Sequence, residues 1–210
     1  MRDVATGSAS GSGRRLRRSR GLRALGAVLA LALAAVALTA CTPDDGDPSV
    51  AEPGYQEGNG AFTTWSPAER PDAPAIAGVD FAGEAVDVAD WRGQVVVLNF
   101  WYAACPPCRA EAPDLAEISQ EYTGDVQLLG INGTDDAATA DAFAQTYGIT
   151  YPSLDDGDAS AVAALEGLVP LRAMPTTVVL DREGRPAARI VGLASKITLS
   201  GLIDDVLAEG

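Results

Sequence analysis

The chain has 210 residues, 47% of them hydrophobic, and carries a formal net charge of −14 with no histidine and three cysteines. The acidic balance argues against a nucleic-acid-binding protein, which needs a basic surface to meet phosphates. The absence of histidine excludes catalytic Ser-His and Cys-His pairs and imidazole metal ligands. Three cysteines are too few for a disulfide scaffold, so each needs its own explanation.

The first 40 residues have the composition of an export signal. They carry seven arginines and one acid, a net charge of +6, whereas residues 41–210 carry a net charge of −20. The arginines precede an uncharged stretch, residues 24–43, that is rich in Ala, Leu and Val. This order is typical of a secretory signal peptide. We therefore predict a signal peptide at residues 1–40, with the rest of the chain on the extracytoplasmic side.

Leu38-Thr39-Ala40-Cys41 resembles the signal of bacterial lipoproteins, in which the cysteine is lipidated and becomes the new N-terminus. The resemblance implies a lipid anchor at Cys41, and each buried CH₂ of an acyl chain contributes about 0.8 kcal/mol to membrane binding. One alternative is an uncleaved transmembrane helix, because 20 uncharged residues are long enough to span a bilayer. A free structural cysteine is another. Arg17-Arg18 leaves the choice between general and twin-arginine export open.

Residues 41–74 are predicted to form a disordered acidic tether. Residues 42–74 contain six prolines, four glycines and seven acids against one basic residue, Arg70. Such a composition buries too little apolar surface to order itself. A flexible chain of this length spans about 30 Å, which keeps the folded domain near the membrane surface. The aromatic residues Tyr55, Phe62 and Trp65 run against this pattern and indicate some packing on the domain.

Strand and helix patterns alternate over residues 75–210. Runs of β-branched and aromatic residues predict buried strands at 94–101 and 126–131, and a short alternation predicts another at 85–88. Helices are predicted at 106–122, 137–147, 160–168 and 197–207. Strands at 176–180 and 187–191 are joined by Asp181-Arg182-Glu183-Gly184, a hairpin signal. The order predicts one α/β domain with a central mixed sheet flanked by helices.

Cys105-Pro106-Pro107-Cys108 lies where the buried strand passes into the helix 106–122. At a helix N-terminus the unpaired N–H groups and the dipole stabilise a thiolate. Proline suits the first turn because it has no N–H, and the two-residue spacing brings the sulfurs within bonding distance. The pattern predicts a redox-active pair. A structural disulfide is an alternative, although so small a loop restricts the unfolded chain little. Half of a zinc site is another, although the remaining ligands are missing.

Residues 99–113, NFWYAACPPCRAEAP, resemble the active-site stretch of membrane-anchored thioredoxin-like proteins of the TlpA/ResA type. Met174-Pro175-Thr176-Thr177 resembles the cis-proline loop of the thioredoxin fold. The resemblance covers about residues 74–210. It implies a thioredoxin-like fold and dithiol–disulfide exchange that needs no cofactor.

The resemblance also assigns roles. Cys105 would attack and Cys108 would resolve the mixed disulfide, supported by the site residues Pro106, Pro107, Trp101, Glu111, Met174, Pro175 and Thr176. A cis Pro175 would face the disulfide and offer backbone groups at residue 174 to a substrate strand. Glu111 would tune the thiol pKa, and Trp101 would shield the site. Each role has an alternative. Pro175 could be an ordinary edge-strand or turn proline, Glu111 a solvated carboxylate in the first helical turn, and Trp101 a residue of the core packing.

The chain departs from the family pattern before the first cysteine, where Ala104 replaces the usual tryptophan. Asn99 stands where cytoplasmic thioredoxins have a buried aspartate, so a proton shuttle must use another group. Residues 170–173, Pro-Leu-Arg-Ala, replace a stretch in which glycine is usual. These changes leave the reaction class intact and bear on partner choice and reduction potential.

The sequence therefore predicts a monomeric, membrane-anchored thiol-disulfide oxidoreductase that exchanges with exported protein thiols and disulfides. The resemblance favours a reductant, with apocytochrome c as a candidate substrate and a membrane thiol-disulfide carrier as electron source. An oxidant of exported proteins is an alternative, since potentials on this fold span about −270 to −120 mV. A peroxiredoxin-like peroxidase is another, although Tyr102 stands where that class has threonine. A non-catalytic lipoprotein docking module is the third.

Overall fold

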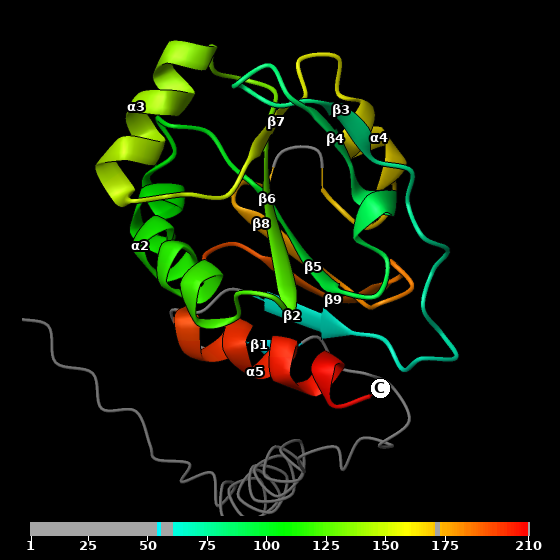
Figure 1. The fold of residues 1–210 in the computed structure, drawn as a ribbon. Helices are drawn as coiled ribbons and strands as arrows, with labels where there is room; N and C mark the ends of the chain where they lie inside the picture. The colour runs from blue at the N-terminus through cyan, green and yellow to red at the C-terminus, as the bar shows by residue number, and fades with distance from the viewer. Residues whose placement is uncertain (1–53, 56–60, 171–172, 210) are drawn as a thin grey trace, which may run out of the picture. The chain divides into compact units, whose positions relative to one another are not determined.

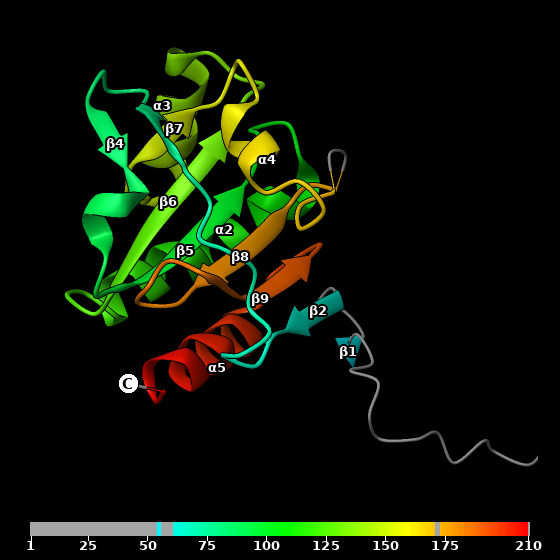
Figure 2. The ribbon, with the colours of Figure 1, turned by 90° about the vertical axis from the view of Figure 1, so that its right-hand side faces the viewer.

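One mixed sheet organises the computed structural model, which describes residues 54–55, 61–170 and 173–209. Seven strands lie in the order β1-β2-β9-β8-β5-β6-β7 (Figures 1 and 2). Their bounds are β1 Gly54–Tyr55, β2 Ala61–Thr64, β5 Val95–Phe100, β6 Val126–Asn132, β7 Ser153–Asp155, β8 Thr176–Leu180 and β9 Pro186–Val191. Strands β5, β6 and β7 are parallel, and the other neighbours pair antiparallel. The predicted central mixed sheet is confirmed.

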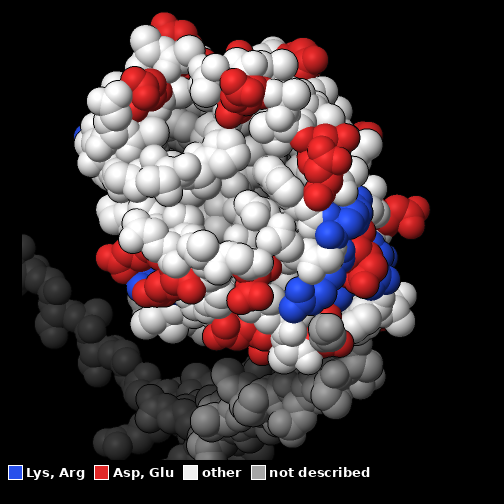
Figure 3. Space-filling model, viewed as in Figure 1, with Lys and Arg blue, Asp and Glu red and all other residues white. Residues whose placement is uncertain are grey.

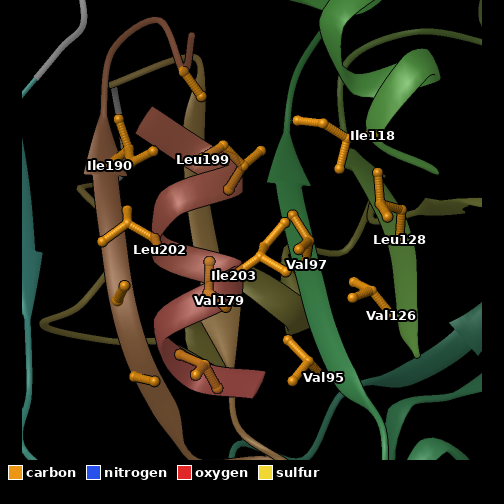
Figure 4. Close-up of a cluster of buried hydrophobic side chains, with 14 of the residues drawn as sticks. Val95, Val97, Ile118, Val126, Leu128, Val179, Ile190, Leu199, Leu202 and Ile203 are labelled. Carbon is orange, nitrogen blue, oxygen red and sulfur yellow. The ribbon is translucent and has the colours of Figure 1, made fainter. Parts of the chain in front are cut away.

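Helices cover both faces of this sheet. They are the short 3₁₀-helix η1 (Val88–Trp91) and the α-helices α2 (Pro106–Glu121), α3 (Ala137–Tyr147), α4 (Ser160–Ala164) and α5 (Lys196–Leu207). Every residue of β5 is buried, and its side chains alternate between two cores. Val95 and Val97 pack with α2, α5, β6 and β9, as Figure 4 shows. Val96, Leu98 and Phe100 pack with α4 and η1. A strand covered on both faces reads as a continuous apolar run, which is why it could be predicted.

The helices begin and end where their capping residues lie. Asp136 caps α3 by accepting a hydrogen bond from the Thr139 N–H at 2.8 Å, and α3 ends at Gly148, whose φ is +70°. Ser195 caps α5 by accepting from the Thr198 N–H at 3.3 Å. These caps fix α3 and α5 against the sheet near the carboxyl end of β5.

The folded part of the chain starts before residue 75, in contrast to the predicted tether at 41–74. Strand β2 pairs with β9, and Phe62 packs against the core beneath α5. The Trp65 N–H donates to the Ala187 carbonyl at 2.9 Å. The Arg70 guanidinium, whose side chain is 2% exposed, pairs with Asp181 at 3.0 Å and Glu209 at 2.6 Å. Apolar anchors and a buried ion pair outweigh the disorder-promoting composition of this stretch.

Two predicted elements differ in extent, and besides β1 and β2 two further strands, β3 and β7, were not predicted. The range 85–88 holds β4 (Ala85–Asp87), which pairs with β3 (Ala77–Val79) in a separate hairpin. Strand β4 ends at Asp87, because the carboxylate of this residue caps the helix η1 that begins at Val88. The helix predicted at 160–168 ends at Ala164, shortly before Gly167 with φ +81°. Strands β3 and β7 have three residues each, too short for a periodic pattern to show. The hairpin at 176–191 is confirmed, with Gly184 at φ +78° in its turn.

On the face shown in Figure 3, most of the visible basic side chains gather at the lower right, whereas acidic ones are scattered. At the turn between β8 and β9, Arg185 pairs with Asp181 at 2.9 Å and Arg182 donates to the Gly93 carbonyl at 2.9 Å. This turn lies beside the beginning of β5, because Leu180 is paired with Val96. The basic group is therefore at the opposite end of β5 from Cys105.

Within the described residues, no helix combines the length and the apolar character needed to cross a membrane. The predicted signal peptide at 1–40 and the predicted lipidation site Cys41 lie outside these residues.

Candidate active site

Cys105 and Cys108 form a disulfide at the start of α2, with their Cα atoms 5.3 Å apart. Cys105 is the N-cap of the helix, and its Sγ accepts a hydrogen bond from the Cys108 N–H at 3.2 Å. Pro106 and Pro107 occupy the first two helical positions, where no partner for their nitrogen is needed. A thiolate at Cys105 would meet this N–H and the positive end of the helix dipole.

Both sulfur-bearing residues are nearly inaccessible in the disulfide form, with Cys105 1% and Cys108 2% exposed. They belong to a small cluster with Trp101, Ala112, Ala140 and Phe143, against which Tyr102 and Met174 pack. The site is therefore apolar on the side of α3, and both sulfur atoms are lined there by apolar side chains.

The Met174–Pro175 peptide bond is cis, at the start of β8. Pro175 is buried, and its carbonyl accepts a hydrogen bond from the Gly192 N–H at 2.9 Å. Thr176 donates from its hydroxyl to the Ala173 carbonyl at 2.6 Å and lies opposite Phe100 in the sheet. The loop is thereby fixed beside the carboxyl end of β5, and half-buried Met174 contacts the cluster that contains both cysteines.

Glu111 is buried on α2, one turn after Cys108, with 1% of its surface exposed. Its two carboxyl oxygens accept hydrogen bonds from Asn99 Nδ2 at 2.7 Å and from the Ala194 N–H at 2.8 Å. Burial raises the pKa of Glu111 to about 7, and the charge of Asp114 acts in the same direction, against the lowering effect of the two hydrogen bonds. The alternative of a solvated carboxylate does not describe this residue.

Asn99 lies in β5 and links Glu111 to the neighbouring strand. Its Nδ2 group also donates to Thr177 Oγ1 in β8 at 3.1 Å. An amide cannot exchange a proton as an aspartate can, so the titratable groups beside Cys108 in the described part of the site are the buried Glu111 carboxyl and the Tyr151 hydroxyl, whose pKa burial raises.

Trp101 is 5% exposed and stacks on Phe143 of α3, with ring centroids 4.3 Å apart. Phe143 in turn meets Tyr147 at 4.7 Å. Gly130 makes room for the indole, because a Cβ there would come within 2.7 Å of Trp101 Nε1 and 2.2 Å of Ser153 Oγ. Trp101 thus packs in the cluster that contains both cysteines.

The sequence analysis missed several parts of this site. Phe143 and Gly130 position Trp101, Ala194 binds Glu111, and the Asp135 carboxylate accepts a hydrogen bond from the Ala103 N–H at 2.6 Å. Phe143 falls on the apolar face of a predicted helix, which was a usable signal. Ala194 is 83 positions from Glu111 in the chain, and nothing in the sequence connects them.

No cluster of three or more metal-ligating side chains occurs among the residues that the structure describes.

Comparisons with known proteins agree with this geometry. The model of the AhpC/TSA family matches residues 70–186. The thiol-disulfide oxidoreductase ResA of Geobacillus thermodenitrificans is 32% identical over 125 residues, which is 59% of this chain and 70% of that protein. The ResA of Halalkalibacterium halodurans is 29% identical over 106 residues, 50% of this chain and 58% of that protein.

Solved structures show the same fold. A DsbF homologue from Corynebacterium diphtheriae superposes with a TM-score of 0.62 and 30% identity, covering 74% of this chain and 99% of that one. A secreted thiol-disulfide isomerase from Corynebacterium glutamicum gives a TM-score of 0.66 and 29% identity, covering 80% and 96%. The chain therefore belongs to the AhpC/TSA family and is a thioredoxin-like thiol-disulfide oxidoreductase of the TlpA/ResA type.

Proposed function

We propose that this oxidoreductase is a reductant of exported protein disulfides, held on the outer face of the cell membrane. The observation that carries the proposal is the buried Glu111 carboxyl, one turn after Cys108. A negative charge at this place opposes a thiolate on either cysteine. Strong oxidants of this fold owe their potential to a stabilised reduced form. A site that opposes the thiolate favours the disulfide, and a dithiol that readily becomes a disulfide is a reductant.

The reaction needs only the two cysteines and the substrate. The Cys105 thiolate attacks one sulfur of a substrate disulfide, and the displaced substrate thiolate takes a proton from solvent. Cys108 then gives its proton to the Glu111 carboxylate and attacks the Cys105 sulfur. The second substrate thiolate leaves and is protonated. The substrate gains two electrons and two protons, and the chain ends with the disulfide seen in the structure.

The cis-proline loop is the proposed substrate-binding element. Its supporting observation is that Met174 packs on the cysteine cluster while Pro175 and Thr176 are held by Gly192 and Ala173. An extended substrate segment would pair with the backbone at residue 174, beside the sulfur of Cys105. Trp101 would keep water from the far side of the pair, and Pro106 and Pro107 would hold the first turn of α2.

The proposed electron source is a membrane thiol-disulfide carrier, and apocytochrome c is the proposed substrate class. Both proposals rest on the resemblance to TlpA/ResA-type proteins. A Cys108→Ser chain expressed in the native host is expected to accumulate a mixed disulfide between Cys105 and its partner. Recovery of a haem-site cysteine peptide would support the substrate, and recovery only of peptides without a haem site would contradict it.

The lipid anchor at Cys41 is proposed from the order of charge, apolar run and cysteine in the first 41 residues. Globomycin, which blocks lipoprotein signal cleavage, should cause a larger precursor to accumulate. Labelled fatty acid should be incorporated into the wild-type chain and not into Cys41→Ala. A wild-type chain that takes up no acyl label and stays membrane-bound at full length would contradict lipidation and support the uncleaved helix.

The redox state of the cysteine pair in cells tests the direction of electron flow. Acid quenching followed by thiol alkylation should show Cys105 and Cys108 mainly as free thiols, which a reductant needs. A pair found mainly as the disulfide would contradict the proposal and support an oxidant. With the purified, unalkylated chain, a peroxide-turnover assay should show no activity beyond that of the Cys105→Ser chain, as expected for a protein that is not a peroxidase.

A further inference from the structure

The loop between β5 and α2 decides where Cys105 lies. At its beginning, the Trp101 N–H donates to the Ile131 carbonyl at 3.1 Å. At its end, the Cys105 N–H donates to the Tyr102 carbonyl at 3.1 Å. Between them, the Ala103 N–H donates to Asp135 Oδ2 at 2.6 Å, so the middle of the turn is held by a side chain from another part of the chain.

Asp135 is itself oriented by the sheet. Asn132, the last residue of β6, is 1% exposed and donates from Nδ2 to Asp135 Oδ2 at 2.8 Å. Its Oδ1 accepts from the Thr134 N–H at 2.9 Å and from the Asp135 N–H at 3.1 Å. A buried amide therefore builds the turn after β6 and aims the Asp135 carboxylate at the cysteine loop. Hydrogen bonds to an ionised acceptor are about twice as strong as neutral ones.

The Asp135 contact places a carboxylate near the cysteine pair. Ala103 is two residues before Cys105, and the exposed side chain of Ala104 contributes no packing that would fix the turn. Among the described residues, the charged groups near the pair include the half-buried Asp135 carboxylate, the buried Glu111 and the exposed Arg109, which donates to Tyr147 at 3.1 Å. A fixed negative charge costs free energy when a thiolate is present and none when the pair is a neutral disulfide.

We propose that Asp135 is a positioning residue of the dithiol site: its carboxylate holds the Ala103 N–H, and with it Cys105 at the N-terminus of α2, and its charge favours the disulfide over the dithiol. The inference rests on the proposed function in that it assigns a second carboxylate to the reducing character of the site. The reaction that tests it has only two reactants: the protein dithiol and glutathione disulfide give the protein disulfide and two glutathione thiols.

The test uses the full chain and separates the charge from the hydrogen bond. Asp135→Asn keeps an oxygen that accepts from the Ala103 N–H and removes the charge, whereas Asp135→Ala removes both. Asp205→Asn on α5 is the matched control, since it removes an exposed carboxylate for which no hydrogen bond or ion pair is seen within the described residues. Urea unfolding of each variant checks that the fold is intact.

Two readouts are expected to respond differently. In glutathione buffers, the equilibrium of Asp135→Asn should shift toward the dithiol by about threefold to tenfold, while Asp205→Asn matches wild type. At a pH where Cys105 is fully thiolate, Asp135→Ala should react with a small disulfide at least about threefold more slowly than Asp135→Asn, because the loop has lost its acceptor. The rate of Asp135→Asn should stay close to that of wild type.

Equal equilibria in wild type and Asp135→Asn would overturn the role of the charge. Equal rates in Asp135→Asn and Asp135→Ala would overturn the positioning role. The proposed function fails in a distinguishable way, through a wild-type chain that does not exchange with glutathione or that has the equilibrium of a strong oxidant. If Asp135→Ala does not fold, a slower rate in Asp135→Ser than in Asp135→Asn supports positioning, and equal rates overturn it.

Discussion

At the scale of single residues, Glu111 is a buried carboxyl one turn after Cys108. Its carboxyl group is satisfied by Asn99 and Ala194, yet burial keeps its pKa at about 7, so it can hold or release a proton near neutral pH. A general acid or base works best when its pKa is close to the working pH. Glu111 is therefore suited to take the proton of Cys108 during exchange.

The raised pKa of Glu111 also links stability to pH. Between its ordinary value of 4.5 and about 7, the folded chain keeps the proton and the unfolded chain releases it. The free energy of unfolding should therefore fall as the pH rises through this window, by about 3 kcal/mol in total. Glu111→Gln should flatten this decline, although it loses one of the two hydrogen bonds. Urea unfolding of the oxidised protein from pH 4 to 8 measures it.

Glu117→Gln is the control for this prediction, because Glu117 lies on the same helix with 62% of its side chain exposed. It should retain the wild-type decline. An equal decline in Glu111→Gln and wild type would show that another group is responsible.

At the scale of elements, the parts of the sheet nearest the cysteines could be predicted because they are covered on both faces. Strand β5 reads as an apolar run that only Asn99 interrupts, α2 begins at two prolines, and the β8–β9 hairpin has a glycine at the turn. The short strands β3 and β7 could not be predicted, since their three-residue pairing depends on partners distant in sequence. The burial of Glu111 was equally hidden, because its partner Ala194 comes from the distant segment between β9 and α5.

Strand β2 shows how tertiary contacts override composition. Its stretch is rich in proline and acids, yet Arg70 connects it to the β8–β9 turn and to the end of α5. Arg70→Ala removes a buried cation from Asp181, which is 4% exposed and keeps only Arg185 as a partner. We expect a loss of about 2 kcal/mol in the free energy of unfolding, measured with urea.

Lys196→Ala serves as the comparison, because Lys196 pairs with Glu117 and Glu121 on the surface. Exposed ion pairs contribute little. Similar effects of Arg70→Ala and Lys196→Ala would mean that the buried Arg70 ion pairs stabilise the domain no more than exposed ones do.

At the scale of the whole molecule, the fold places its chemistry at one end of the sheet. The cysteines follow the carboxyl end of β5, while the basic side chains of the β8–β9 turn lie at its other end. Fold class, helix start and cysteine pair could be predicted because each is a local signal. The arrangement of carboxylates around the pair arises from β6, α2 and the segment before α5, and only the three-dimensional structure reveals it.

The redox state of the pair should change the stability of the whole domain. If the folded site favours the disulfide more than the unfolded chain does, linkage requires the oxidised protein to be more stable than the reduced one. A difference of 30 mV in potential corresponds to about 1.4 kcal/mol. Urea unfolding of both forms should give the higher midpoint for the oxidised protein. A higher midpoint for the reduced protein would identify an oxidant.

The central claim is dithiol exchange in which Cys105 attacks and Cys108 resolves. Its most direct test is peptide mass spectrometry of mixed disulfides trapped in cells by Cys108→Ser, with Cys105→Ser as the matched variant. The account predicts adducts joined to Cys105 in the first variant and none joined to Cys108 in the second. Adducts on Cys108 alone, or none on either cysteine, would contradict it.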